Sequence, residues 1–194
     1  LYKEGIGRIV PALKKIGYKG PIDLNTIVTQ DKLYGLEFTA RFGYDALYVL
    51  LEMYKGKIGD LMYGVATGVL KKMEFRAEWG IGIALVVPPY PLPCEPDLYK
   101  DILIQGVGPE NQRHIWFYDV YKSDGRLLCG GCGGDVMDIT ARGDKIDSWS
   151  PLRDAKRRVM RTISNLVIPD VMYRRDIGDR VPGDYAQLKK WGWI

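Results

Sequence analysis

A stretch of alternating apolar and polar residues near the start of the chain constrains its fold more than any other feature. Residues 21–29 and 33–40 read as two strands, and Gln30, Asp31 and Lys32 between them have the composition of a turn. Because successive strand residues point to opposite faces, the two strands predict an antiparallel hairpin with one apolar face packed on a core. That face is predicted to carry Ile22, Leu24, Val28, Tyr34, Leu36 and Phe38.

The other face of the predicted hairpin concentrates oxygen-bearing side chains. A turn centred on Asp31 places Asp23 opposite Thr39, and the same register places Asn25 opposite Glu37. Two carboxylates, an amide and a hydroxyl then share about 10 Å of one face. Such a ligand set suits Mg²⁺, which takes one or two carboxylates together with substrate phosphates. The alternative is a solvated polar face without a ligand.

The rest of the chain predicts a mixture of helices and short strands. Residues 8–16 indicate a short helix, and a second helical pattern from Asp45 to Gly68 is interrupted near Gly56 and Gly59. A further helix opens at Ser150-Pro151, with an apolar face and a basic outer face. Strands are predicted within residues 81–87, 102–108, 114–122 and 136–140. We therefore expect an α+β chain with two units, 1–70 and 71–182, and a tail at 183–194.

Composition excludes several classes of function. The net charge of +4 is small and spread out, so we expect no nucleic-acid partner, and no apolar run reaches the roughly 18 residues of a membrane span. The cysteines are Cys94, Cys129 and Cys132, an odd and low count that favours a reducing, cytoplasmic location. The Cys129–Cys132 spacing fits a zinc or redox motif less well than a glycine-rich hairpin with free thiols. His114 is the only histidine, and we interpret it as a packed edge residue rather than a catalytic base.

Three separated motifs carry a resemblance to a known family. They are LEFTARFG at 36–43, GGDVMDITARG at 133–143 and YRRDIGDRV at 173–181. They resemble LEFNARFG, GGRVL-x-VTA-x-G and YRxDIGxRA of the phosphoribosylamine–glycine ligase family, which belongs to the ATP-grasp ligases. The motifs stand in the family's order over roughly residues 5–181. The resemblance implies the second half of an ATP-grasp domain, followed by a small β-rich C-terminal domain with a covering helix.

The resemblance also implies roles for the polar face of the hairpin. Glu37 matches the family's Mg²⁺ ligand, Asp23 matches the first acid of the wider superfamily, and Thr39 stands where the family has an Asn ligand. Arg41 matches the arginine near the transferring phosphoryl group, so we assign it as the catalytic residue. We assign Asn25 and Arg41 to ATP binding, with Mg²⁺ or Mn²⁺ as the metal.

The implied activity is ATP-dependent formation of a C–N bond between glycine and 5-phosphoribosylamine, through an acyl phosphate, in purine biosynthesis. In the family a substrate domain and the first ATP-grasp lobe precede the matched region, so we expect this N-terminal lobe in a parent chain or a partner chain. Two alternatives stay open. Tyr44, Asp45 and Ala46 replace the family's Asp-Pro-Glu, which favours a diverged ligase with another acid or amine. The other alternative is a non-catalytic binding or structural module that retains the fold.

Overall fold

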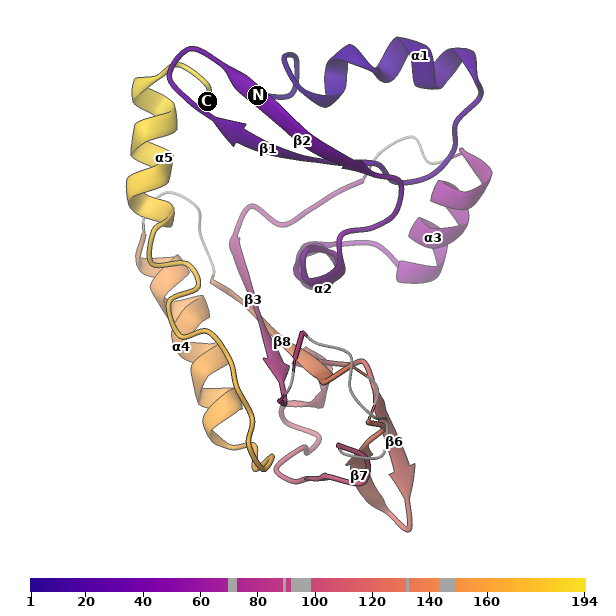
Figure 1. Ribbon diagram of the computed structural model, residues 1–194, viewed down its shortest axis with the longest axis vertical. Coiled ribbons are helices and arrows are strands. Elements are labelled where there is room, and N and C mark those ends of the chain that lie inside the picture. Colours follow the sequence, from indigo (N-terminus) through magenta and orange to yellow (C-terminus); the bar gives the residue numbers. More distant parts are fainter. Residues whose placement is uncertain (70–72, 89, 92–98, 132, 144–148) are drawn as a thin grey trace. The chain divides into compact units, whose positions relative to one another are not determined.

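The computed structural model of the chain separates into two compact units (Figure 1). It describes residues 1–69, 73–88, 90–91, 99–131, 133–143 and 149–194. The hairpin unit comprises Leu1–Leu47, Tyr54–Phe75 and Asp179–Ile194, and the sheet unit comprises Tyr48–Met53 and Arg76–Gly178. The expected boundary at residues 70–71 falls on positions outside the described residues. No helix within the described ranges is long and apolar enough to cross a membrane.

The hairpin unit is built around two antiparallel strands, β1 (Asp23–Val28) and β2 (Leu33–Thr39). This confirms the predicted hairpin and its turn. The helical elements of the unit are η1 (Ile6–Arg8), α1 (Val10–Lys15), α3 (Ile58–Thr67), α5 (Val181–Lys190) and the first turn of α2 (Tyr44–Met53). Residues 183–194, which we expected as a tail, therefore lie largely in a helix.

A β-bulge in the hairpin corrects the predicted distribution of side chains between its faces. Asn25 pairs with Glu37, and Ile27 pairs with Tyr34. Between these two pairs β2 therefore contains one residue more than β1. The extra residue is Leu36, and it reverses the alternation towards the turn. Tyr34 consequently lies on the polar face beside Ile27, and not on the apolar face where the alternation predicted it.

The expectation that the apolar face packs on a core is also wrong at Leu36 and Phe38. Leu36 and Phe38 are 62% and 54% exposed. The segment before α1 covers part of this face, because a Cβ at Gly5 beside η1 would lie 3.6 Å from side-chain carbons of both Leu24 and Leu33. The apolar face is thus partly covered and partly open within this unit.

The sheet unit contains two antiparallel three-stranded sheets among the described residues. One has the order β3 (Trp79–Val86), β8 (Asp135–Gly143) and β5 (Ile115–Phe117). The other has the order β4 (Leu103–Ile104), β7 (Arg126–Cys129) and β6 (Val120–Ser123). The sequence predicted all of these strands except β7, which lies in the glycine-rich stretch. A short 3-10 helix, η3 (Gln112–His114), precedes β5.

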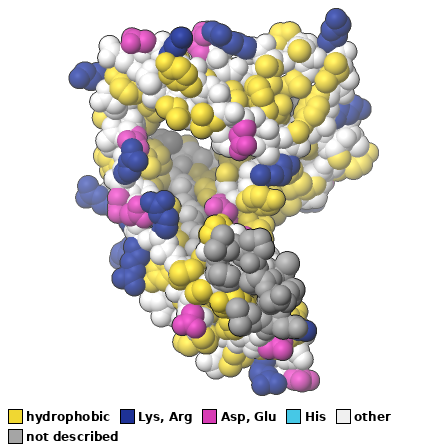
Figure 2. Space-filling view, viewed as in Figure 1, with side chains coloured by type: hydrophobic (Ala, Val, Ile, Leu, Met, Phe, Trp, Pro, Cys, Tyr) yellow, Lys and Arg dark blue, Asp and Glu magenta, His cyan; other side chains and the backbone are white. Residues whose placement is uncertain are grey.

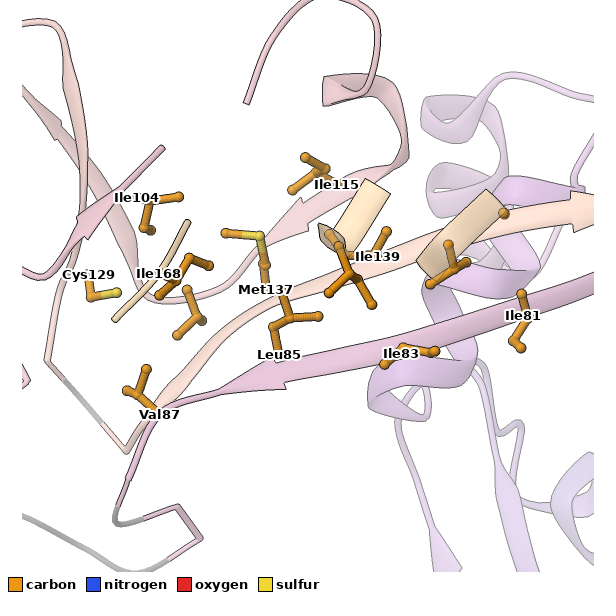
Figure 3. Close-up of a cluster of buried hydrophobic side chains, with 14 of the residues drawn as sticks. Ile81, Ile83, Leu85, Val87, Ile104, Ile115, Cys129, Met137, Ile139 and Ile168 are labelled. Carbon is orange, nitrogen blue, oxygen red and sulfur yellow. The ribbon is translucent and has the colours of Figure 1, made fainter. Parts of the chain in front are cut away.

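Helix α4 (Ser150–Ser164) covers the first sheet with its apolar face, as its periodicity predicts. It buries Leu152, Ala155, Val159 and Ile163. The core of the sheet unit gathers aliphatic side chains from β3, β8 and β5, including Ile83, Leu85, Met137, Ile139 and Ile115 (Figure 3). Helices combined with antiparallel sheets confirm the expected α+β class.

Gly106 permits a close backbone approach in this unit. Its φ is +87°, and an added Cβ would lie 1.9 Å from the carbonyl oxygen of Asn165. We expect Gly106→Ala to destabilise the sheet unit by about 3 kcal/mol, because backbone must shift to relieve the clash. Gly125, also at positive φ but with open space around it, is the control, and Gly125→Ala should cost about 1 kcal/mol. Urea unfolding monitored by circular dichroism measures both, and equal losses would contradict the close approach.

Candidate functional site

The register of the hairpin brings the four predicted ligand residues together on one face. Asp23 lies opposite Thr39, and Asn25 lies opposite Glu37, as the sequence predicted. The Nδ2 of Asn25 donates a hydrogen bond of 2.9 Å to Oε1 of Glu37. This bond orients the Glu37 carboxylate and leaves its second oxygen for another partner. Asp23, Asn25 and Glu37 are exposed, and Thr39 is half-buried.

This donor set fits a magnesium ion better than a transition metal. It offers two carboxylates, one hydroxyl and one amide carbonyl, all of them hard oxygen ligands. No group of three or more His, Cys, Asp or Glu side chains suited to a metal occurs in the described part of the chain. Two carboxylates are what Mg²⁺ uses when phosphate oxygens and water complete its coordination.

The loop after β2 lies at the Asp23 end of this face. A Cβ at Gly43 would be 3.9 Å from Oδ2 of Asp23. In the same loop, the NH1 of Arg41 donates to the carbonyl oxygen of Phe42 at 2.8 Å. The guanidinium carbon of Arg41 also lies 4.1 Å from the centre of the Tyr44 ring. These contacts hold Arg41 within the loop and use one of its five N–H donors, so the others remain for an anion.

Sequence reasoning missed the apolar end of this face. The bulge places Ile27 and Tyr34 on it, where they are 55% and 49% exposed. Ile27 is four residues from Asp23, or about 13 Å at the strand repeat. The face therefore carries oxygen ligands at one end and an aliphatic and aromatic pair at the other. The break in alternation at Ile27 and Leu33 was the available signal.

A second polar cluster lies within the sheet unit and centres on Glu52, near the end of α2. Its side chain is only 7% exposed. Its Oε2 accepts a hydrogen bond of 3.0 Å from the Thr140 hydroxyl and lies 3.1 Å from Nδ1 of His114. Its Oε1 lies 3.5 Å from Nε of Arg142. The buried carboxylate thus has partners from β8 and from η3.

Further contacts complete this network. Arg142 donates from NH1 to both oxygens of Glu78, at 2.8 and 3.1 Å, and Trp116 donates from Nε1 to the Thr140 hydroxyl at 2.9 Å. The Tyr48 ring stacks on Trp116 with their centres 5.0 Å apart. His114 is therefore a packed histidine held by a carboxylate. This agrees with the structural interpretation of it, and sequence spacing gave no sign of Glu52.

Cys129 is buried at the end of β7. Burial, and secondarily the negative charge of Asp119, raises the pKa of its thiol to about 11. Cys94 and Cys132, the other members of the possible zinc or redox motif, lie outside the described residues.

A pKa near 11 predicts an unreactive Cys129 thiol. At pH 8 about one molecule in a thousand would carry the thiolate, which is the reactive form. We expect iodoacetamide to alkylate Cys129 at least tenfold more slowly in the native chain than in urea. Tandem mass spectrometry of time points assigns the label to Cys129 separately from Cys94 and from Cys132, which lies on the same tryptic peptide, and equal rates in the two states would contradict the buried thiol.

Comparison with solved structures relates the fold to a ligase. The phosphoribosylamine–glycine ligase of Thermotoga maritima superimposes with a TM-score of 0.65 at 23% sequence identity, over 84% of this chain and 39% of that chain. At this identity the match establishes the α+β fold. No protein-family model matches the chain.

Curated relatives point to the same family by sequence. Phosphoribosylamine–glycine ligase of Caldanaerobacter subterraneus is 26% identical over 171 residues, which is 87% of this chain and 39% of the relative. The enzyme of Methanococcus maripaludis is 26% identical over 89% of this chain and 38% of its own length. The chain thus spans about two fifths of the length of these relatives. The comparisons confirm the resemblance to phosphoribosylamine–glycine ligases that LEFTARFG and YRRDIGDRV predict.

Proposed function

We propose that this chain is part of an ATP-dependent ligase that joins a carboxylate to an amine, with glycine and 5-phosphoribosylamine as the substrates. The observation that carries the proposal is the hairpin register, which sets Asp23 against Thr39 and Asn25 against Glu37. The names of the relatives support the ligase class and its place in purine biosynthesis. Because the chain spans about two fifths of those relatives, it supplies one wall of the site and needs the remaining polypeptide for turnover.

The polar face of the hairpin would hold the metal and the phosphates. Asp23, Glu37 and the Thr39 hydroxyl are the proposed ligands of Mg²⁺ or Mn²⁺. When bound, the metal supplies positive charge that neutralises the phosphates of ATP. Asn25 keeps the Glu37 carboxylate oriented through its 2.9 Å hydrogen bond. Ile27 and Tyr34, further along the same face, would contact the base of the nucleotide, because aromatic side chains stack on its flat faces and aliphatic side chains pack against them.

Arg41 would stabilise the phosphoryl group during transfer. A carboxylate oxygen of the acid attacks the γ-phosphorus of ATP, the bond to the β-phosphate oxygen breaks, and an acyl phosphate and ADP form. The amine then attacks the acyl carbon, and inorganic phosphate leaves while the amine loses a proton. The free N–H donors of Arg41 would bind the negatively charged oxygens of the transferred phosphoryl group. Most of the protein's work is positioning and charge stabilisation.

A second candidate is a diverged ligase with another acid or amine. Tyr44 stands where the family has Asp, and its ring packs against Arg41. The loop beside the proposed phosphoryl site therefore differs from the family in shape and charge. A module that binds without catalysis is the third reading, and it predicts no turnover with any substrate.

Phosphate release from ATP tests the proposal. The 194-residue chain is assembled with the complementary portion of the Thermotoga maritima ligase, and release is measured with glycine and 5-phosphoribosylamine. We expect release that requires both substrates. Release only with another acid or amine would favour the diverged ligase, and no release with any substrate would favour the non-catalytic module.

A further inference from the structure

A hydrogen bond joins the segment after α5 to the turn of the hairpin. The Nε1 of Trp193 donates to the carbonyl oxygen of Thr29 at 2.8 Å. The two residues are 164 positions apart in the sequence, both are half-buried, and both belong to the hairpin unit. In Figure 1 the end of the chain lies beside the turn that connects β1 and β2. The bond is therefore a tertiary contact within one compact unit.

The end of α5 directs Trp193 towards this turn. The N–H of Trp193 donates to the carbonyl oxygen of Leu188, and the N–H of Gly192 donates to that of Lys189, both at 3.0 Å. These two bonds, with Gly192 at a φ of +76°, form the Schellman arrangement that ends many helices. The backbone position of Trp193 is therefore fixed by the end of the helix.

The position of the indole is selected by a directional bond and not by apolar contact alone. Figure 2 shows hydrophobic side chains over much of the visible surface of the hairpin unit, so an aromatic ring would meet apolar neighbours in many places. A hydrogen bond of 2.8 Å, in contrast, requires one acceptor in one orientation. The indole of Trp193 is thus tied to the carbonyl group of Thr29.

This carbonyl group belongs to a turn that is itself held by hydrogen bonds. The N–H of Thr29 donates to the carbonyl oxygen of Lys32 at 2.8 Å, and the N–H of Lys32 donates to Oγ1 of Thr29 at 3.2 Å. The Nζ of Lys32 lies 5.8 Å from the centre of the Tyr34 ring. A bond that holds Thr29 therefore also restrains the residues that lead into β2.

The turn lies next to the apolar end of the candidate site. Ile27, which pairs with Tyr34, is two residues from Thr29, or about 7 Å along the strand. Asp23, at the metal end of the face, is six residues from Thr29, or about 20 Å. A contact at Thr29 therefore acts on the part of the hairpin proposed for the base and not on the proposed metal ligands.

We propose that Trp193 is a positioning residue whose hydrogen bond to Thr29, here called the latch, fixes Ile27 and Tyr34 for the base of the nucleotide. Trp193 acts through the turn and not by touching the nucleotide. Without the latch the turn moves more freely and the base loses a fixed surface, while the phosphates and metal keep Asp23. This inference rests on the proposed function, since it adds a positioning residue to that site.

Trp193→Phe tests the latch, because it removes the N–H donor and retains an aromatic ring. In the 194-residue chain, NMR titration measures the dissociation constants of Mg²⁺-ATP and of Mg²⁺-tripolyphosphate, which has three phosphates and no base. We expect about fivefold weaker binding of ATP, the usual effect of one lost hydrogen bond, and unchanged binding of tripolyphosphate. Hydrogen exchange at the amides of Thr29 and Lys32 should be about fivefold faster for the same reason.

Trp191→Phe is the matched control. It makes the same replacement at the C-cap of α5 and should change neither the affinities nor the exchange. Gly192→Ala is a second variant, because it retains the indole but strains the backbone that directs it, and it should also weaken binding of ATP selectively. The amide of Leu13, which donates to the carbonyl oxygen of Ile9 at 3.0 Å, should exchange at the same rate in every variant that keeps its fold.

Unchanged exchange at the Thr29 and Lys32 amides of Trp193→Phe would overturn the latch. Equal weakening of ATP and tripolyphosphate would also overturn the proposal, because a residue that positions only the base leaves the phosphates bound. Exchange that depends on Trp193, in a chain that binds neither ATP nor tripolyphosphate, would support the latch and contradict only the proposed function.

Discussion

Replacing Glu37 with Gln is expected to lower the turnover of the assembled ligase at least a hundredfold. Gln has the size of Glu and can still accept the hydrogen bond from Nδ2 of Asn25, so the hairpin should keep its geometry. It removes one of the two carboxylates that the proposed metal site has, and with it the charge that holds a divalent cation. A hundredfold loss corresponds to about 2.7 kcal/mol of transition-state stabilisation. The measurement is kcat for phosphate release at saturating ATP and Mg²⁺.

Asp31 provides the matched control for this prediction. It is an exposed carboxylate in the hairpin turn, at the other end of the strands from Asp23. Asp31→Asn removes the same charge from the same hairpin and should leave turnover unchanged. Near-normal activity of Glu37→Gln, or equal losses in both variants, would contradict the assignment of Glu37 as a metal ligand.

Replacing Glu52 with Ala is expected to destabilise the sheet unit by about 3 kcal/mol. The substitution removes the acceptor of the Thr140 hydroxyl and the partner of His114, and it takes one of two carboxylates from Arg142. Removing one member of a buried polar network leaves its partners with fewer hydrogen-bond acceptors away from water, which costs several kcal/mol. Glu52→Gln, which retains an acceptor, should cost less. Urea unfolding followed by tryptophan fluorescence, to which Trp116 of the network contributes together with the other four tryptophans, measures the loss.

Glu110 is the control for the Glu52 variants. It is an exposed glutamate of the same unit, and Glu110→Ala should change the free energy of unfolding by less than about 0.5 kcal/mol. A loss below that value in Glu52→Ala would show that the network adds little to stability.

The local features of the hairpin were readable from the sequence. The alternation of apolar and polar residues predicted the two strands. A turn centred on Asp31 predicted the pairing of Asp23 with Thr39 and of Asn25 with Glu37. The bulge at Leu36 was not readable, because a one-residue insertion depends on the twist and neighbours of the strands and not on their composition. That bulge decides the face on which Tyr34 lies, and so the apolar end of the candidate site escaped prediction.

The Glu52 network was hidden for a different reason. Glu52 and His114 are 62 residues apart, and Thr140 is 88 residues from Glu52. Helical periodicity shows which face of α2 is apolar, but it carries no information about which strand the rest of the helix meets. Helix α4 was predictable because apolar residues recur in its sequence at helical spacing, and that spacing alone identifies the face that packs.

The central claim is that the polar face of the hairpin binds metal and nucleotide. Paramagnetic broadening of backbone amide signals by Mn²⁺ with ATP tests it in the 194-residue chain, because this effect detects weak binding by a single wall of a site. The account predicts broadening at residues 23–25 and 37–43, and its loss in the Glu37→Gln variant. Broadening confined to other segments, or unchanged broadening in that variant, would contradict it.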